Sequence, residues 1–210
     1  MISEELQNLL LNYCEPEDEL LQHIDRETNL KVLMPRMLSG HYQGRVLSMI
    51  SKMNQPKRIL EIGTFTGYAT LCLAEGLTID GIIYTLDVNA ELEDMVRGNF
   101  SKSPLNSKIK YIIGDAQLSL KTLKTEVFDL VFIDADKKNN GTYYDLIFDQ
   151  VKPGGIIIVD NVLWSGKILA NSQDKDTKNI STFNDQIAAD ERVEKLILPV
   201  RDGLFIIRKK

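Results

Sequence analysis

Three oxygen-bearing side chains stand directly after two apolar runs of the sequence. Asp134 follows DLVFI, while Asp160 and Asn161 follow GGIIIV. Carboxylate and amide oxygens are the ligands that hard cations such as Mg²⁺ or Ca²⁺ prefer, and no cysteine or histidine stands beside them to favour zinc. Two carboxylates grouped without a cation would raise each other's pKa. The grouping therefore favours a divalent cation at this place.

A lysine follows the first of these acids. Lys137 stands three residues after Asp134, in FIDADKK. A bound cation would lower the pKa of a substrate hydroxyl, and if positive charge also lowers the pKa of Lys137, this side chain could take the hydroxyl proton. The alternative is a solvated surface lysine, which we expect of Lys138. Asp160 and Asn161 have a turn as their alternative.

A glycine-containing stretch, LEIGTFTGYAT, lies between a strand-like run and a helix-like run, where α/β proteins bind nucleotides. A dinucleotide-binding turn would read G-x-G-x-x-G, but Phe65 replaces its middle glycine between Gly63 and Gly67. Phe65 would obstruct a pyrophosphate, and Glu61 at the strand end favours a cationic ligand. S-adenosylmethionine, with its sulfonium and amino groups, is such a ligand. A turn without any ligand is the alternative.

Acids at two further strand ends weaken that alternative. Asp87 stands twenty residues after Gly67, where a carboxylate can bind ribose hydroxyls. Asp115 and Ala116, in GDAQ, could border the adenine. Beyond the second apolar run, Trp164 either packs in the core or lines an acceptor pocket.

The elements that must position these residues follow from the alternation of β-branched runs with helix-like segments. This alternation predicts an α/β fold, a doubly wound and mostly parallel sheet with helices on both faces. In such a sheet the ligands bind at the carboxyl ends of the strands, where the strand order reverses. We expect an antiparallel hairpin from VEKLILPV and GLFIIRK to close the sheet. The parallel strands are predicted at 58–62, 82–87, 109–113, 128–133 and 155–160.

The remaining segments lack strand signals. Residues 1–57 show helical spacing of apolar residues and predict two or three helices that cap the sheet of 58–210, all within one domain. The polar stretch 165–178 is expected to be a loop at the mouth of the site.

Composition excludes several classes of protein. The chain has 210 residues and a formal charge of −5, so nothing attracts it as a whole to nucleic acid or to an anionic membrane. Cys14 and Cys72 have no metal-type spacing, which favours free thiols in a reducing cytoplasm. The first residues, MISEELQNLLLNY, carry acids instead of the positive charge of a signal peptide.

Four motifs, LEIGTFTGYAT, FIDADK, VDNVLW and DERVEKLILPVRDGLFIIRK, together resemble the cation-dependent O-methyltransferases of the caffeoyl-CoA and catechol type, especially their small bacterial members. The resemblance runs from about residue 34 to the C-terminus. It implies a seven-stranded, Rossmann-like class I methyltransferase sheet and a homodimer. It also implies a metal bound by Asp134, Asp160 and Asn161, with Lys137 as the base.

The same resemblance nominates the remaining site residues. It implies that Trp164 borders the acceptor, and that the segment MLSGHYQG covers the cofactor through Met37, Ser39 and Gly44. The residues that it places against S-adenosylmethionine, together with the rest of the loop, are Glu61, Gly63, Phe65, Gly67, Asp87, Asp115, Ala116 and Asp134.

Departures from the family pattern bear on the acceptor. Asn140 stands where the family often has tyrosine, and 165–178 is shorter than in the plant enzymes and lacks their aromatic and arginine acceptor contacts. A free catechol or hydroxycinnamate, able to chelate the metal, is therefore a simpler acceptor than a CoA thioester. The alternatives are a hydroxylated tRNA base, which the acidic net charge disfavours, and a cofactor-binding protein without chemistry.

Overall fold

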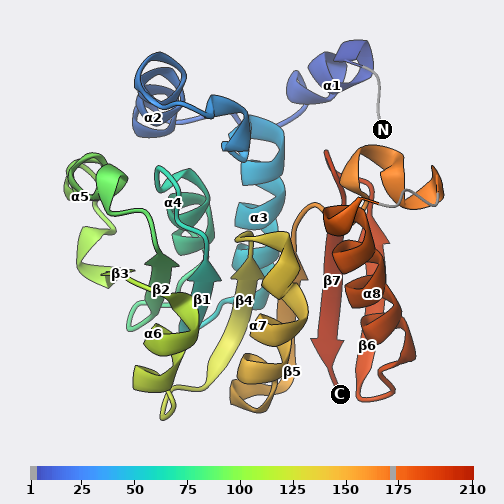
Figure 1. The fold of residues 1–210 in the computed structure, drawn as a ribbon. Helices are drawn as coiled ribbons and strands as arrows, with labels where there is room; N and C mark the ends of the chain where they lie inside the picture. The colour runs from blue at the N-terminus through green and yellow to red at the C-terminus, as the bar shows by residue number, and fades with distance from the viewer. Residues whose placement is uncertain (1–3, 171–173) are drawn as a thin grey trace.

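A seven-stranded sheet with the order β3-β2-β1-β4-β5-β7-β6 forms the centre of the protein in the computed structural model, which describes residues 4–170 and 174–210 (Figure 1). Neighbouring strands from β3 to β5 pair in parallel, and β7 runs antiparallel to both β5 and β6. The predicted sheet and its C-terminal hairpin are confirmed. The strands are β1 Arg58–Ile62, β2 Ile82–Asp87, β3 Ile109–Ile113, β4 Phe128–Ile133, β5 Val151–Val159, β6 Val193–Leu198 and β7 Leu204–Lys209.

The first four strands have the predicted bounds, whereas β5 begins four residues before the predicted 155. Val151 already pairs with Phe128 of β4, and the register shifts before the next pair, Leu130 with Ile156. Gly154 has a φ of +79° within this irregularity. Pro153 and the two glycines after it, which suggest a turn in the sequence, are thus contained in a bulged strand.

Helices cover both faces of the sheet (Figure 1). Side chains alternate between the faces along each strand, so apolar strand residues are buried on both sides. On one face, Ile59 and the buried apolar residues of the neighbouring strands pack against Leu47 of α3 and Leu73 of α4. On the other face, Leu60 and the buried apolar residues of the neighbouring strands pack against residues of α6, α7 and α8. The helices are α1 Glu4–Leu11, α2 Glu19–Lys31, α3 Gly40–Asn54, α4 Tyr68–Ala74, α5 Glu93–Ser101, α6 Ala116–Thr122, α7 Asn140–Ile147 and α8 Lys175–Ala189, with short 3-10 turns that include η1 Pro35–Met37 and η6 Trp164–Ala170.

The N-terminal helices α1 and α2 lie above the edge of the sheet to which β1, β2 and β4 point (Figure 1). A buried hydrogen bond of 3.0 Å from the Thr28 hydroxyl of α2 to the Thr66 hydroxyl joins this cap to the loop after β1. The cap therefore contacts the edge where the candidate site residues stand.

The prediction of a loop over 165–178 is wrong for most of its described part. Trp164–Ala170 forms η6, with left-handed backbone at Ser165 and Gly166, and α8 begins at Lys175. Residues 171–173 lie outside the described residues. The Asp174 carboxylate caps α8 by accepting from the Thr177 backbone N–H. The polar residues of this stretch were interpreted as a loop, although they include this helix cap. Within the described residues, the structure has no helix with the length and hydropathy needed to cross a bilayer.

Candidate active site

The strand ends bring the predicted acids together. The sheet ladder continues one residue beyond β1, β4 and β5, where the backbone N–H groups of Gly63, Asp134 and Asp160 donate to carbonyls of the neighbouring strands. Asp134 donates to Ile62 at 2.8 Å, and Asp160 donates to Ile133 at 3.0 Å. The three residues thus stand side by side at one edge of the sheet, as predicted for parallel strands.

Asp160 and Asp134 form a pair of carboxylates with unequal exposure. Asp160 is buried, and the pKa of its side chain is raised to about 7, first by desolvation and then by the negative charge of Asp134. Lys137 opposes this shift, and its Nζ lies 2.9 Å from Asp134 Oδ1. The two acids are therefore close enough to repel each other, with one lysine to offset the charge.

The donor set fits a hard divalent cation. Asp134, Asp160 and Asn161 supply only oxygen ligands at a strand edge, and a cation there would remove the repulsion between the carboxylates. Asn161 has a φ of +61°, in the left-handed region that asparagine tolerates better than most residues. In residues 4–170 and 174–210 no group of three or more His, Cys, Asp or Glu gathers as a metal site. The candidate centre is not such a group, because its three ligands are two carboxylates and one amide.

The loop after β1 has a positive φ at Gly63, Phe65 and Gly67. Gly63 has a φ of +106°, and a Cβ at this position would lie 2.3 Å from the Asp134 carbonyl oxygen. Gly67 has a φ of +87°, and a Cβ there would collide with Phe100. Phe65 itself has a φ of +51°. The loop therefore keeps a left-handed conformation at the position where a dinucleotide fingerprint has glycine.

Glu61 is a fully buried acid below this loop. Its Oε2 accepts from the hydroxyls of Thr70 and Thr85, the latter at 2.5 Å, whereas its Oε1 has no partner. Desolvation raises the pKa of Glu61 to about 8, and the hydroxyl donors only partly offset this. A buried carboxylate with an unpaired oxygen fits a cationic group such as the amino group of S-adenosylmethionine.

Asp87 ends β2, Asp115 stands two residues beyond the end of β3, and both hold the local backbone. Asp87 Oδ2 accepts from the Phe65 N–H at 2.7 Å, and Asp87 Oδ1 accepts from the Asn89 N–H. Asp115 caps α6 by accepting from the Leu118 N–H at 3.1 Å, so that Ala116 is the first residue of that helix. Asp87 thus fixes the turn that the sequence predicts to bind the cofactor.

The segment from Met37 to Ser39 lies across the glycine loop. A narrow pocket is lined by residues of this segment and of the loop together with Asp134. Arg201, from the β6–β7 turn, holds the segment by donating to the carbonyl oxygens of Leu38 and Ser39, the former at 2.6 Å. The structure therefore unites several predicted cofactor contacts in one pocket, namely Met37, Ser39, Gly63, Phe65 and Asp134.

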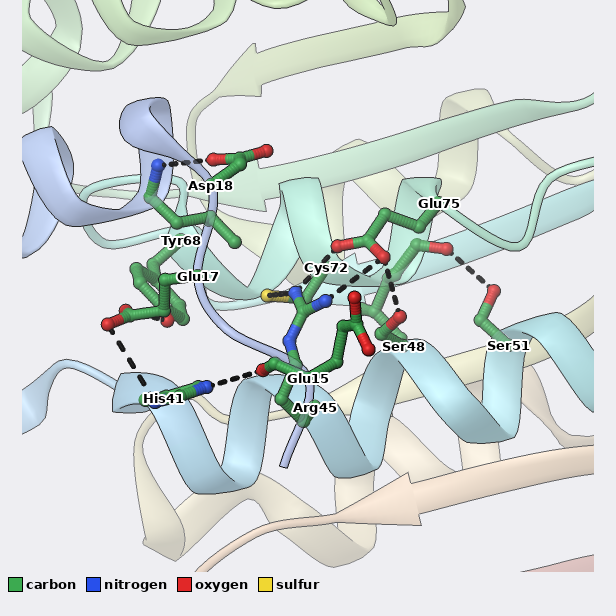
Figure 2. A network of polar contacts seen from close by, with 12 residues as sticks. Glu15, Glu17, Asp18, His41, Arg45, Ser48, Ser51, Tyr68, Cys72 and Glu75 are labelled. Carbon is green, nitrogen blue, oxygen red and sulfur yellow. Dashed lines mark hydrogen bonds and ion pairs between the residues drawn. The ribbon is translucent and has the colours of Figure 1, made fainter. Parts of the chain in front are cut away.

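A polar network attaches the N-terminal cap to α3 and α4 beside this pocket (Figure 2). Tyr68, which also lines the pocket, donates its hydroxyl proton to Glu17, and His41 lies between Glu17 and the carbonyl of Glu15. Farther along the same helices Arg45 is paired with Glu75 at 2.6 Å. The linker before α2 is therefore held over α4 by specific contacts.

Two further predicted residues have distinct surroundings. Trp164 has a φ of +47° and is half-buried, with its indole N–H buried and without a partner. Gly44 lies at the contact of α3 with α4, where a Cβ would lie 2.7 Å from the Tyr68 ring and 2.8 Å from Cys72 Sγ. Close packing of the two helices explains the glycine at this position.

Three contacts of the site were missed from the sequence. Gln43 donates from α3 to Asp160 Oδ2, Thr28 binds the loop at Thr66, and Arg201 holds the segment 36–39. Gln43 lies in the segment MLSGHYQG and Arg201 in the motif DERVEKLILPVRDGLFIIRK, but neither was singled out within its motif. Thr28 lies in no such motif, and its local pattern is that of an ordinary helix residue.

Comparison with known proteins identifies the family to which the chain belongs. The sequence profile of a family described as O-methyltransferase matches residues 12–210. The chain therefore belongs to the O-methyltransferase family, and it is an S-adenosylmethionine-dependent O-methyltransferase with a class I fold.

Individual relatives agree with this assignment. A caffeoyl-CoA O-methyltransferase of Stellaria longipes is 33% identical over 204 residues, which cover 92% of this chain and 84% of that protein. A catechol O-methyltransferase of Mycobacterium tuberculosis is 37% identical over 143 residues, covering 68% of this chain and 65% of the relative.

Two solved structures are similar over nearly the whole chain. An O-methyltransferase from Bacillus cereus in complex with SAH has a TM-score of 0.90 and 30% identity, covering 98% of this chain and 97% of the other. An SAH-bound methyltransferase from Podospora anserina has a TM-score of 0.88 and 29% identity, with 100% and 97% covered.

Proposed function

We propose that this enzyme depends on a divalent cation and transfers the methyl group of S-adenosylmethionine to one hydroxyl of a catechol or hydroxycinnamate-type small molecule. The observation that carries the proposal is the adjacency of the carboxylate pair Asp134 and Asp160 to the glycine loop at Gly63. This adjacency would put a cation beside the cofactor. The caffeoyl-CoA and catechol O-methyltransferases among the relatives support an acceptor of this class.

The cofactor would be held from several strand ends. In this proposal Glu61 pairs with the amino group and Asp87 accepts from the ribose hydroxyls, while Asp115 and Ala116 border the adenine. The loop residues Gly63, Phe65 and Gly67 bring their backbone close to the cofactor, and Met37 and Ser39 cover it from the opposite side. The buried unpaired oxygen of Glu61 supports the first of these roles.

The cation would be held by Asp134, Asp160 and Asn161, and when bound it would supply a positive charge that lowers the pKa of an acceptor hydroxyl. Lys137 would take the hydroxyl proton, and its Nζ is already within hydrogen-bond distance of Asp134. Trp164, three residues after Asn161, would flank the acceptor ring. We also propose that the enzyme acts as a homodimer.

Methyl transfer from labelled S-adenosylmethionine to a panel of acceptors tests this function. The panel pairs catechols with monophenols of the same size, each assayed with Mg²⁺, with Ca²⁺ and with EDTA. We expect label in the catechols only, and only with a cation. Label that persists in EDTA would overturn the cation dependence, and label found only in an RNA substrate would overturn the small-molecule acceptor.

A variant separates the metal site from the cofactor site. Asp160→Ala is expected to abolish cation-dependent turnover and to leave SAH binding largely intact, because Asp160 is assigned to the metal alone. Full turnover of this variant in the presence of a chelator would contradict the mechanism.

A further inference from the structure

Gln43 makes a contact with the candidate metal centre that is remote in sequence. Its side chain is fully buried in the first turns of α3, and its Nε2 donates to Asp160 Oδ2 at 2.7 Å across 117 positions of the chain. A residue of α3 thus reaches the end of β5 on the sheet.

Two donors together fix the orientation of the Asp160 carboxylate. Gln43 binds Oδ2, and the Asn161 backbone N–H donates to Oδ1 at 2.6 Å. A carboxylate has about four lone-pair positions, so each oxygen keeps a position for a cation. The two bonds restrict the rotation of the carboxylate without using up its capacity to bind metal.

The chemical type of Gln43 suits this task. An amide donates a hydrogen bond without adding positive charge, so the negative charge of Asp160 stays available to a cation. A lysine or arginine at this place would partly neutralise that negative charge. The Oε1 of Gln43 is buried and has no hydrogen-bond partner. Because an unpaired buried amide oxygen costs stability, packing alone gives no reason to keep glutamine at this position.

We infer that Gln43 is a positioning residue that holds the Asp160 carboxylate in the orientation in which it binds the divalent cation. This inference rests on the metal site proposed above. Groups that orient metal-binding side chains typically change metal affinity or activity by about 10- to 100-fold when they are removed.

The test measures Mn²⁺ binding to the purified enzyme by the electron paramagnetic resonance signal of free Mn²⁺. We expect Gln43→Met to weaken Mn²⁺ binding by about 10- to 100-fold while leaving the affinity for SAH unchanged. In assays, the concentration of Mg²⁺ that gives half-maximal turnover should rise by a similar factor, with kcat nearly restored at saturating Mg²⁺. Gln43→Leu provides a second variant that lacks the amide.

Ser51→Ala is the matched control, because Ser51 is another fully buried polar residue of α3 whose hydroxyl donates to the Leu73 carbonyl, away from Asp160. This control should lower thermal stability and leave Mn²⁺ binding unchanged. Wild-type Mn²⁺ affinity in both Gln43 variants would overturn the inference and leave the metal site standing. Absence of Mn²⁺ binding to the wild-type enzyme would overturn the metal site and the inference together. Equal loss of Mn²⁺ binding in Ser51→Ala would show a general structural effect and also overturn the inference.

Discussion

Lys137 Nζ lies 2.9 Å from Asp134 Oδ1, and both side chains are largely shielded from solvent, with 13% and 19% exposed. Lys137 stands three positions after Asp134, in the turn after β4. This geometry distinguishes Lys137 from the next lysine, Lys138, whose side chain is 63% exposed and lies 3.8 Å from Asp136. The pair of neighbouring lysines thus provides a test with its own control.

We predict that Lys137→Met lowers kcat by about 10²- to 10⁴-fold, the usual contribution of a general base. SAH binding should be unchanged, because the proposed cofactor contacts do not include the amine. Lys138→Met should keep wild-type kcat. Steady-state kinetics with a catechol and Mg²⁺ check both, and equal activity of the two variants would remove Lys137 from the mechanism.

Glu61 provides a prediction for pH. The pKa of this carboxyl is raised from 4.5 to about 8, so between these values the native protein holds a proton that the unfolded chain has lost. Stability should therefore fall as pH rises through this window, and Glu61→Gln should flatten that dependence. Denaturant unfolding of both proteins from pH 5 to pH 8 measures the difference.

Cofactor binding should reverse the protonation of Glu61. An ammonium group beside the carboxylate favours its charged form, so SAH binding at pH 7 should release up to about one proton from this residue. Isothermal titration calorimetry in buffers of different ionisation enthalpy measures the release. Glu61→Gln should abolish that release and weaken SAH binding by roughly 10- to 100-fold, from the loss of a charge-assisted hydrogen bond. An unchanged proton count in this variant would mean that Glu61 does not pair with the amino group.

The strands and the acids of the proposed metal site were predictable because each depends on short-range sequence patterns. Runs such as RILEI mark buried parallel strands, and parallel topology sends every strand end to the same edge, so Asp134 and Asp160 were expected at one edge of the sheet. Gln43 and Arg201 act through contacts that cross more than 100 residues, and their local patterns are those of an ordinary helix and an ordinary turn. These contacts depend on tertiary packing, which a single sequence does not encode in any local spacing.

Phe65 is a residue whose chemistry was predicted and whose conformation was not. Its bulk argued against a dinucleotide, but a φ of +51° is uncommon for any residue other than glycine, so the sequence predicted no left-handed turn here. We predict that Phe65→Gly is more stable than Phe65→Ala by about 1 kcal/mol, the reverse of the usual order, because alanine keeps the strained backbone without the packing of the ring. Denaturant unfolding of the two variants measures the difference, and a more stable alanine variant would contradict the left-handed conformation.

Arg201 links the C-terminal hairpin to the segment that covers the glycine loop. Its guanidinium donates to the carbonyl oxygens of Arg36, Leu38 and Ser39. Arg201→Met should release this segment, because a thioether cannot donate to the carbonyls. We predict weaker SAH binding, by about 5- to 50-fold for the loss of one or two bonds from a charged donor, and faster hydrogen exchange at residues 36–40.

The matched control for Arg201 is Arg208→Met, which removes an exposed pair with Glu194 on the neighbouring strands. An exposed ion pair contributes little, so this variant should bind SAH as the wild type does. Calorimetry measures the affinity, and exchange measured by mass spectrometry locates the release. Faster exchange at 36–40 with unchanged affinity would show that Arg201 orders the segment but that the segment does not hold the cofactor, which would withdraw Met37 and Ser39 from the proposed binding site.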